Sequence, residues 1–170
     1  DWPKNRVSIL LREAGSERIS EPLFRAIRSA DNNDQIYLLQ FARLMESETL
    51  DVMLTDLIRE HNDAGVINAA LKIMRGYHGV PRIAALTRHD AWFVRMQAAN
   101  VLGRVGQQEH VALLEALLDD PEWWVRYRAA QAITRLPFLG PNHLRLLRMR
   151  QTDRFAADIL QQAFAEAGLV

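Results

Sequence analysis

The sequence contains no cysteine and almost no lysine. Without cysteine the chain can form no disulfide, no thiolate nucleophile and no Cys-ligated zinc site. Only Lys4 and Lys72 are lysines among the 21 cationic residues, and the others are arginines. Arginine favours planar, bidentate contacts with carboxylates or phosphates over diffuse positive charge. A genome that prefers arginine codons explains the same bias equally well.

Long hydrophobic runs are also missing. An Arg, Asp or Glu interrupts every candidate before the roughly 18 to 20 apolar residues that a membrane span requires. We therefore expect a soluble segment without membrane contact. The chain begins at Asp1 without an initiator methionine or a recognisable signal peptide, which favours a processed chain or a domain excised from a longer one. Cytoplasmic and periplasmic locations both stay open.

The 170 residues are 49% hydrophobic and 25% charged, which is typical of one globular unit with a substantial core. The net charge is zero, but the charges are segregated along the chain. Residues 31–63 hold eight acids against two arginines, and residues 121–154 hold seven arginines against two acids. Opposite charge at the two ends predicts salt-dependent self-association.

Two segments near the middle of the chain repeat each other. Within residues 90–105 and 120–136, the matching residues lie at a constant offset of 31, which places Arg95 on Arg126 and Val94 on Val125. Weaker copies lie at 66–74, at 155–160 and at 35–45. Self-similarity at this period is typical of a solenoid.

We therefore predict an all-α solenoid of about five antiparallel helix pairs, in one repeat domain over residues 1–170. The clearest repeats lie at 64–136, and capping repeats are expected at 1–33 and 137–170. Within each pair, apolar residues recur at helical spacing, and the Ala98-Ala99 and Ala129-Ala130 pairs favour close helix approach.

Turn and cap residues predict where the helices begin and end. Asp120 is expected as an N-cap with Pro121 at the first helical position, Ser20 is expected to precede a helix at Glu21-Pro22, and Ser47 is expected to precede another. Gly103 and Gly106 are expected to end a helix.

The pattern Asp-Pro-x-x-x-Val-Arg-x-x-Ala-Ala-x-Ala-Ile at residues 120–133 resembles the second helix of HEAT repeats, in the short form named after phycobilisome lyases. The resemblance implies that second helices line a concave face. It also implies that Arg95 and Arg126 form a structural ladder with Asp90 and Asp120 of adjacent units. HEAT folds include scaffolds, carriers and a few enzymes, so the fold alone assigns no function.

A strip of outward-facing residues on the second helices is the candidate binding site. The 3.6-residue period predicts that these side chains point away from the core, with Asn68, Lys72 and Arg75 continuing the strip upstream. The strip comprises Met96, Gln97, Asn100, Arg104, Tyr127, Arg128, Gln131 and Arg135, together with Trp92 and Trp123. In each turn pair, Trp92-Phe93 and Trp123-Trp124, one ring is expected to plug the gap between repeats and the other to lie half exposed. A merely solvated polar face is the alternative interpretation.

These features predict a non-catalytic scaffold that binds another protein along the strip, with no cofactor and no metal. The five histidines form no His-x-x-x-His pair, and Glu60-His61 and Glu109-His110 reverse the iron-binding His-Glu order of HEAT-like deoxyhypusine hydroxylase. The alternative is a nucleic-acid-binding HEAT-like protein, including an enzyme similar to a DNA glycosylase. Residues 123–128 are rich in Arg and Trp, as such a nucleic-acid-binding surface would be, but the chain lacks an overall basic charge.

Overall fold

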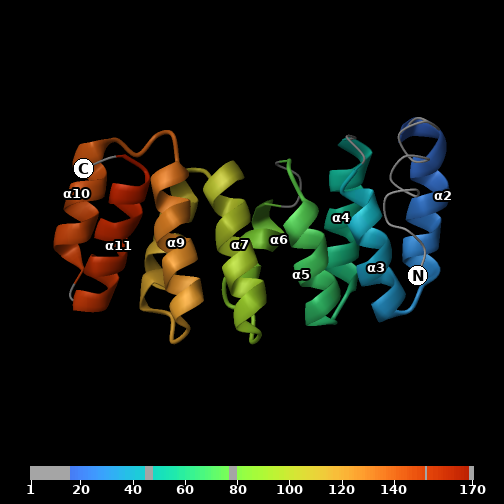
Figure 1. The fold of residues 1–170 in the computed structure, drawn as a ribbon, viewed down its shortest axis with the longest axis horizontal. Coiled ribbons are helices and arrows are strands. Elements are labelled where there is room, and N and C mark those ends of the chain that lie inside the picture. The colour runs from blue at the N-terminus through green and yellow to red at the C-terminus, as the bar shows by residue number, and fades with distance from the viewer. Residues whose placement is uncertain (1–15, 45–47, 77–79, 152, 169–170) are drawn as a thin grey trace. The chain divides into compact units, whose positions relative to one another are not determined.

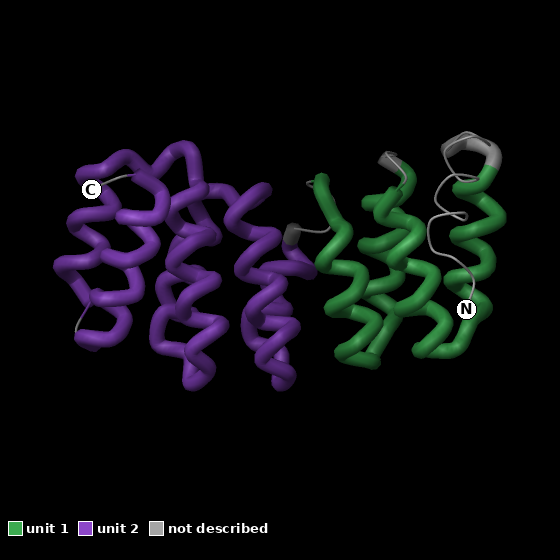
Figure 2. The backbone as a smooth tube through the Cα atoms, in the orientation of Figure 1, with its two compact units in different colours: residues 1–79 green, residues 80–170 purple. Residues whose placement is uncertain are grey.

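The computed structural model describes residues 16–44, 48–76, 80–151 and 153–168, and every regular element in these ranges is a helix. The backbone forms two compact units, residues 1–79 and residues 80–170 (Figure 2). The all-α class is confirmed. That the two units form a single domain stays a prediction. Of the predicted N-terminal capping repeat at 1–33, residues 1–15 lie outside the described residues.

The described residues of unit 1 form two helix pairs (Figure 1). The helices are α2 (Ser16–Ser29), α3 (Asn32–Ala42), α4 (Glu48–Glu60) and α5 (Ala64–Ile73). Within the pairs α2 contacts α3 and α4 contacts α5, and the second helices α3 and α5 pack against each other. Each successive pair thereby covers the apolar face of the one before it.

Unit 2 contains three further helix pairs. They are α6 (Val80–Leu86) with α7 (Trp92–Val105), α8 (Val111–Ala116) with α9 (Trp123–Arg135), and α10 (Pro141–Arg150) with α11 (Arg154–Glu166). Two 3-10 turns, η1 (Gln108–His110) and η2 (Leu117–Asp119), flank α8. The second helices α7, α9 and α11 lie side by side (Figure 1), with α9 in contact with both neighbours. The predicted solenoid of about five pairs is confirmed.

Aspartate side chains cap three of the second helices. Asp31, Asp63 and Asp153 each accept a hydrogen bond of 2.9 Å from a main-chain N–H in the first turn of α3, α5 and α11, respectively. Such a bond satisfies one of the N–H groups that a helix leaves unpaired at its start. The sequence patterns had not singled out these three residues as caps.

Two predicted helix starts are wrong. Helix α9 begins at Trp123 after Glu122, not at Pro121. The Asp120 carboxylate binds Arg95 of the preceding repeat and also accepts a hydrogen bond of 2.9 Å from the main-chain N–H of Glu122, which precedes the helix. Pro22 lies inside α2, which already includes Ser16, so Ser20 starts no helix. The third predicted start, Ser47, lies outside the described residues.

The core of unit 2 contains the residues that were predicted to be buried, but one predicted helix end is wrong. Val94, Val125 and both predicted alanine pairs are completely buried. Gly103 does not end a helix: it is buried inside α7, which ends at Val105. A Cβ at Gly103 would lie 2.6 Å from the Cα of Ala132 on α9. Glycine is therefore required at this position because the backbones of α7 and α9 approach closely there.

Candidate functional site

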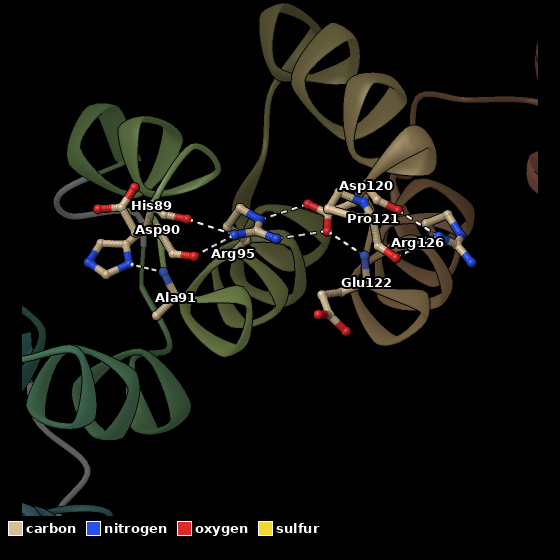
Figure 3. Close-up of polar contacts among 8 residues, drawn as sticks. All are labelled: His89, Asp90, Ala91, Arg95, Asp120, Pro121, Glu122 and Arg126. Atoms are coloured by element: carbon tan, nitrogen blue, oxygen red, sulfur yellow. Dashed lines mark hydrogen bonds and ion pairs between the residues drawn. The ribbon is translucent and has the colours of Figure 1, made fainter.

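Arg95 joins two successive repeats of unit 2 (Figure 3). Its Nε and Nη2 donate to the two carboxylate oxygens of Asp120, at 2.7 and 2.8 Å. Its Nη1 donates to the main-chain carbonyls of His89 and Asp90, at 2.9 and 2.8 Å. The hydrogen bonds to Asp120 raise the pKa of the Arg95 guanidinium. This rung of the implied ladder is confirmed.

Arg126 repeats only half of this arrangement. Its Nη1 donates to the main-chain carbonyls of Asp120 and Pro121 in its own turn, at 2.6 and 3.1 Å (Figure 3). Its Nε is enclosed and has no hydrogen-bond partner. The ladder is therefore wrong for Arg126, which meets the carbonyl of Asp120 and not a carboxylate of an adjacent unit. Asp90 likewise offers its carbonyl to Arg95, and its carboxylate is not used in that contact.

One part of the predicted strip connects α7 to α9. Arg135 Nη1 donates to Asn100 Oδ1 at 3.1 Å, and Asn100 Nδ2 donates to Gln97 Oε1 at 3.3 Å. Met96 is half-buried and Arg104 is exposed on the same helix α7. The structure therefore brings Gln97, Asn100 and Arg135 into one polar cluster across the repeat boundary.

A second part of the strip is a cluster on α9. The ring of Trp123 stacks on that of Tyr127, with centroids 5.1 Å apart and planes at 9°. Gln131 Nε2 donates to the Tyr127 hydroxyl at 2.9 Å, and Arg128 Nη1 donates to Gln131 Oε1 at 2.9 Å. Trp123 keeps 41% of its surface exposed. Four predicted residues thus form one surface that combines aromatic rings with polar groups.

Glu166 of α11 completes this cluster. Its Oε2 accepts hydrogen bonds from the Tyr127 hydroxyl at 2.8 Å and from Gln131 Nε2 at 3.3 Å. Its Oε1 accepts one from Gln162 Nε2 at 3.0 Å. The hydrogen bond between Tyr127 and Glu166 lowers the pKa of the Glu166 carboxyl and raises the pKa of the Tyr127 hydroxyl.

Sequence reasoning did not include Glu166 or Gln162 in the strip. The strip was predicted from the repeat signature, which is weak in α11, so the signature placed neither residue near Tyr127. Their spacing of four residues does place them on one helix face, and this pattern could have found them.

An open hollow of about 280 Å³ lies beside the strip, between α9 and α11. Its lining residues are Gln131, Thr134, Arg135, Ala163, Glu166 and Ala167. Cationic Arg135 and anionic Glu166 face the same hollow, so it can take a polar side chain of either sign.

The turn aromatics differ between the two repeats. Trp92 is 37% exposed, as predicted for one ring of the pair, and meets Phe93 edge to face. Phe93 is half-buried, and its place as the plug between repeats stays a prediction. Neither Trp123 nor Trp124 is buried, so the predicted plug is wrong for the second pair. The two tryptophan rings meet edge to face at 4.7 Å, and Trp123 stacks on Tyr127, so both rings contact aromatic neighbours on α9.

The upstream part of the predicted strip lies in unit 1. Lys72 is exposed on α5, Asn68 on the same helix is half-buried, and the main-chain N–H of Arg75 donates to Asp51 at 2.9 Å. A hollow of about 480 Å³ lies between α3 and α5. It is lined by Ile36, Leu39, Gln40, Phe41, Arg43, Leu44, Ala69, Lys72 and Ile73.

The described residues contain no group of three or more His, Asp or Glu side chains that could hold a metal ion. None of the helices in the described ranges is long and apolar enough to cross a membrane.

Comparison with known proteins connects this architecture to a family. The model of HEAT repeats matches residues 52–134 and, in a second overlapping register, residues 80–167. No curated protein matches the chain. HEAT repeats generally mediate protein–protein interaction. Because the matches extend over more than half of its length, the chain belongs to the HEAT-repeat proteins.

Proposed function

We propose that the chain is a non-catalytic interaction module that binds a partner protein through the second-helix strip of unit 2. The observation that carries the proposal is the exposed Trp123–Tyr127 stack, which is hydrogen-bonded into the Gln131–Arg128 pair. Trp, Tyr and Arg are the residues that most often dominate the binding energy of protein interfaces. The hydrogen bonds hold these side chains in place before binding, which reduces the entropy lost on association.

Nucleic acid is the second candidate ligand for this strip, because bases stack on exposed tryptophan rings. The arrangement of charge favours protein. Glu166 places a carboxylate at the Tyr127 hydroxyl, beside the aromatic stack, where it would repel phosphate groups. Arg128 is hydrogen-bonded to Gln131, and Arg135 to Asn100, so neither guanidinium is wholly available to phosphate.

The test is an affinity pull-down from a lysate of the source organism, with wild type and the Arg128→Glu/Arg135→Glu variant side by side. The matched control is Arg145→Glu/Arg148→Glu, which makes the same charge change at exposed positions of α10, the first helix of its pair. We expect wild type and control to recover the same protein, and the strip variant to lose it, with similar melting temperatures throughout.

Treatment with nuclease separates the two ligand classes. Recovery that persists after nuclease supports a protein partner, whereas nuclease-sensitive recovery would move nucleic acid ahead of it. Equal recovery by the strip variant and wild type would contradict the strip assignment. Salt-dependent self-association stays a separate prediction, and sedimentation that is the same at low and high salt would contradict it.

A further inference from the structure

The internal repeat identifies one position at which the Arg–Asp ladder changes. Asp120 follows Arg95 by 25 residues, and the offset of 31 between the repeats takes these two positions to Arg126 and Gln151. The arginine is therefore retained in the next repeat, while a neutral amide takes the place of the carboxylate. The Arg95–Asp120 pair therefore shows which chemical group, a carboxylate, binds an arginine at this repeat position.

The two guanidinium groups are held in the same way. In each, Nη1 donates to two consecutive main-chain carbonyls of the turn that precedes the helix. These carbonyl bonds leave the Nε and Nη2 of each guanidinium as a second, planar pair of donors. In Arg95 that pair binds both oxygens of one carboxylate. In Arg126 the Nε is enclosed without a hydrogen-bond partner.

Of the following turn, the structure describes the polar residues Gln151 and Asp153, and the hydrogen bonds of both go to the main chain. Gln151 Nε2 donates to the carbonyl of Leu147 at 3.4 Å, and its amide carries no charge. Asp153 Oδ1 accepts from the main-chain N–H of Phe155 as the N-cap of α11. A buried donor without a partner is unfavourable, so a ligand that supplies the missing acceptor recovers part of that free energy.

We propose that Nε and Nη2 of Arg126 form a carboxylate-binding site, which takes an Asp or Glu side chain of the partner protein. The proposal rests on the proposed function, because it names a chemical feature of the same partner. Arginine and a carboxylate match in a bidentate, charge-assisted geometry, and the carbonyl bonds already fix the orientation of the guanidinium.

Exposed aromatic residues favour an acidic segment that also carries apolar side chains. Trp124 in the first turn of α9 is 54% exposed, and Phe155 in the first turn of α11 is 71% exposed. The offset of 31 relates these two positions, so they recur at the same end of successive second helices. The Arg126 guanidinium bonds the turn at that end of α9.

The test uses the ¹H–¹⁵N NMR signals of the arginine Nε–H groups in the whole chain, assigned with Arg126→Lys and Arg95→Lys. The probe is an acetylated peptide of alternating Glu and Leu, and its control is the same peptide with Gln for Glu. We expect the Glu peptide to shift the Arg126 signal, the Gln peptide to leave it unchanged, and the Arg95 signal to stay still with both.

A second arm supplies the carboxylate from within the chain. Gln151→Asp, or Gln151→Glu if that variant folds poorly, should shift the Arg126 signal without peptide, raise the melting temperature and abolish the peptide response. Gln151→Asn should keep the response. An Arg126 signal that ignores the Glu peptide, or that responds equally in Gln151→Asp, overturns the proposal. So does a shift of that signal in Asp153→Asn without peptide, because Asp153 would then hold the site.

The NMR result for Arg126 is independent of the pull-down result for the strip. If recovery depends on Arg128 and Arg135 while the Arg126 signal ignores the peptide, the strip stands and the carboxylate site falls. If Arg126 responds while recovery ignores the strip variant, the carboxylate site stands and the strip falls.

Discussion

Two successive repeat boundaries in unit 2 join equivalent second helices in different ways. Between α7 and α9, Gly103 lets the backbones approach, and Arg95 with Asp120 closes the polar edge. Between α9 and α11 there is an open hollow, and the Nε of Arg126 has no partner. The first boundary pairs its turn arginine with a carboxylate of the next turn, whereas at the second boundary the Nε of the equivalent arginine has no acceptor. The same turn arginine is therefore paired at one boundary and has an unpaired Nε at the next.

The largest effect on this comparison should come from Asp120→Ala. The Arg95 side chain is only 13% exposed, and removal of its carboxylate leaves a partly buried charge without its counterion. We expect a loss of about 3 kcal/mol in the free energy of unfolding, measured by urea denaturation with tryptophan fluorescence. Asp119→Ala is the matched control, because it removes an exposed acid at the adjacent position. Equal losses in the two variants would show that the rung does not stabilise the boundary.

Gly103→Ala should have the next largest effect. The added Cβ meets the backbone of Ala132, which cannot move without separating α7 from α9. Overpacking of this kind costs about 1–3 kcal/mol, and the better helix propensity of alanine offsets about 1 kcal/mol of it. The control is Gly140→Ala, where nothing lies within 4 Å of the added Cβ. A melting temperature of Gly103→Ala at or above that of wild type would contradict the close approach.

The smallest effect should come from Tyr127→Phe at the second boundary, and it should depend on pH. Because the lowered pKa of Glu166 favours its ionised form in the folded state, the stabilisation is present above the ordinary carboxyl pKa near 4.5. It is lost as the pH falls through the lowered pKa. The difference in unfolding free energy between wild type and variant should therefore shrink between about pH 6 and about pH 3.

Tyr37→Phe is the control for this titration, because Tyr37 is an exposed tyrosine of unit 1 whose ring packs edge to face on Phe41. It should show no such pH dependence. A difference for Tyr127→Phe that stays constant across the titration would mean that its hydroxyl bond to Glu166 contributes nothing in solution.

Much of the fold could be predicted because repeat packing leaves a periodic record in the sequence. Val94 and Val125 could be placed in the core because burial of one helix face requires apolar residues at helical spacing. Helix starts were predicted less well, since Asp120 has the side chain of a cap and yet bonds the preceding repeat. Gly103 carried the same ambiguity, because a glycine that ends a helix and one that admits a neighbouring backbone are identical in sequence.

The strip residues Tyr127, Gln131 and Arg135 could be placed on one helix from their spacing, but their partners could not. Glu166 lies 39 residues from Tyr127, and the Arg135–Asn100 bond joins positions 35 residues apart. Contacts at that separation depend on how neighbouring repeats pack, for which local spacing contains no signal.

By itself, the sequence determined the all-α class, the repeat, the family and the buried positions, because each follows from a period in residue type. The tertiary structure decided which polar groups are satisfied. Arg95 and Arg126 occupy the same repeat position, and the structure shows that the first is paired with Asp120 while the Nε of the second is unpaired. The physical reason is that hydrogen bonding depends on distances of a few tenths of an ångström between segments far apart in the chain.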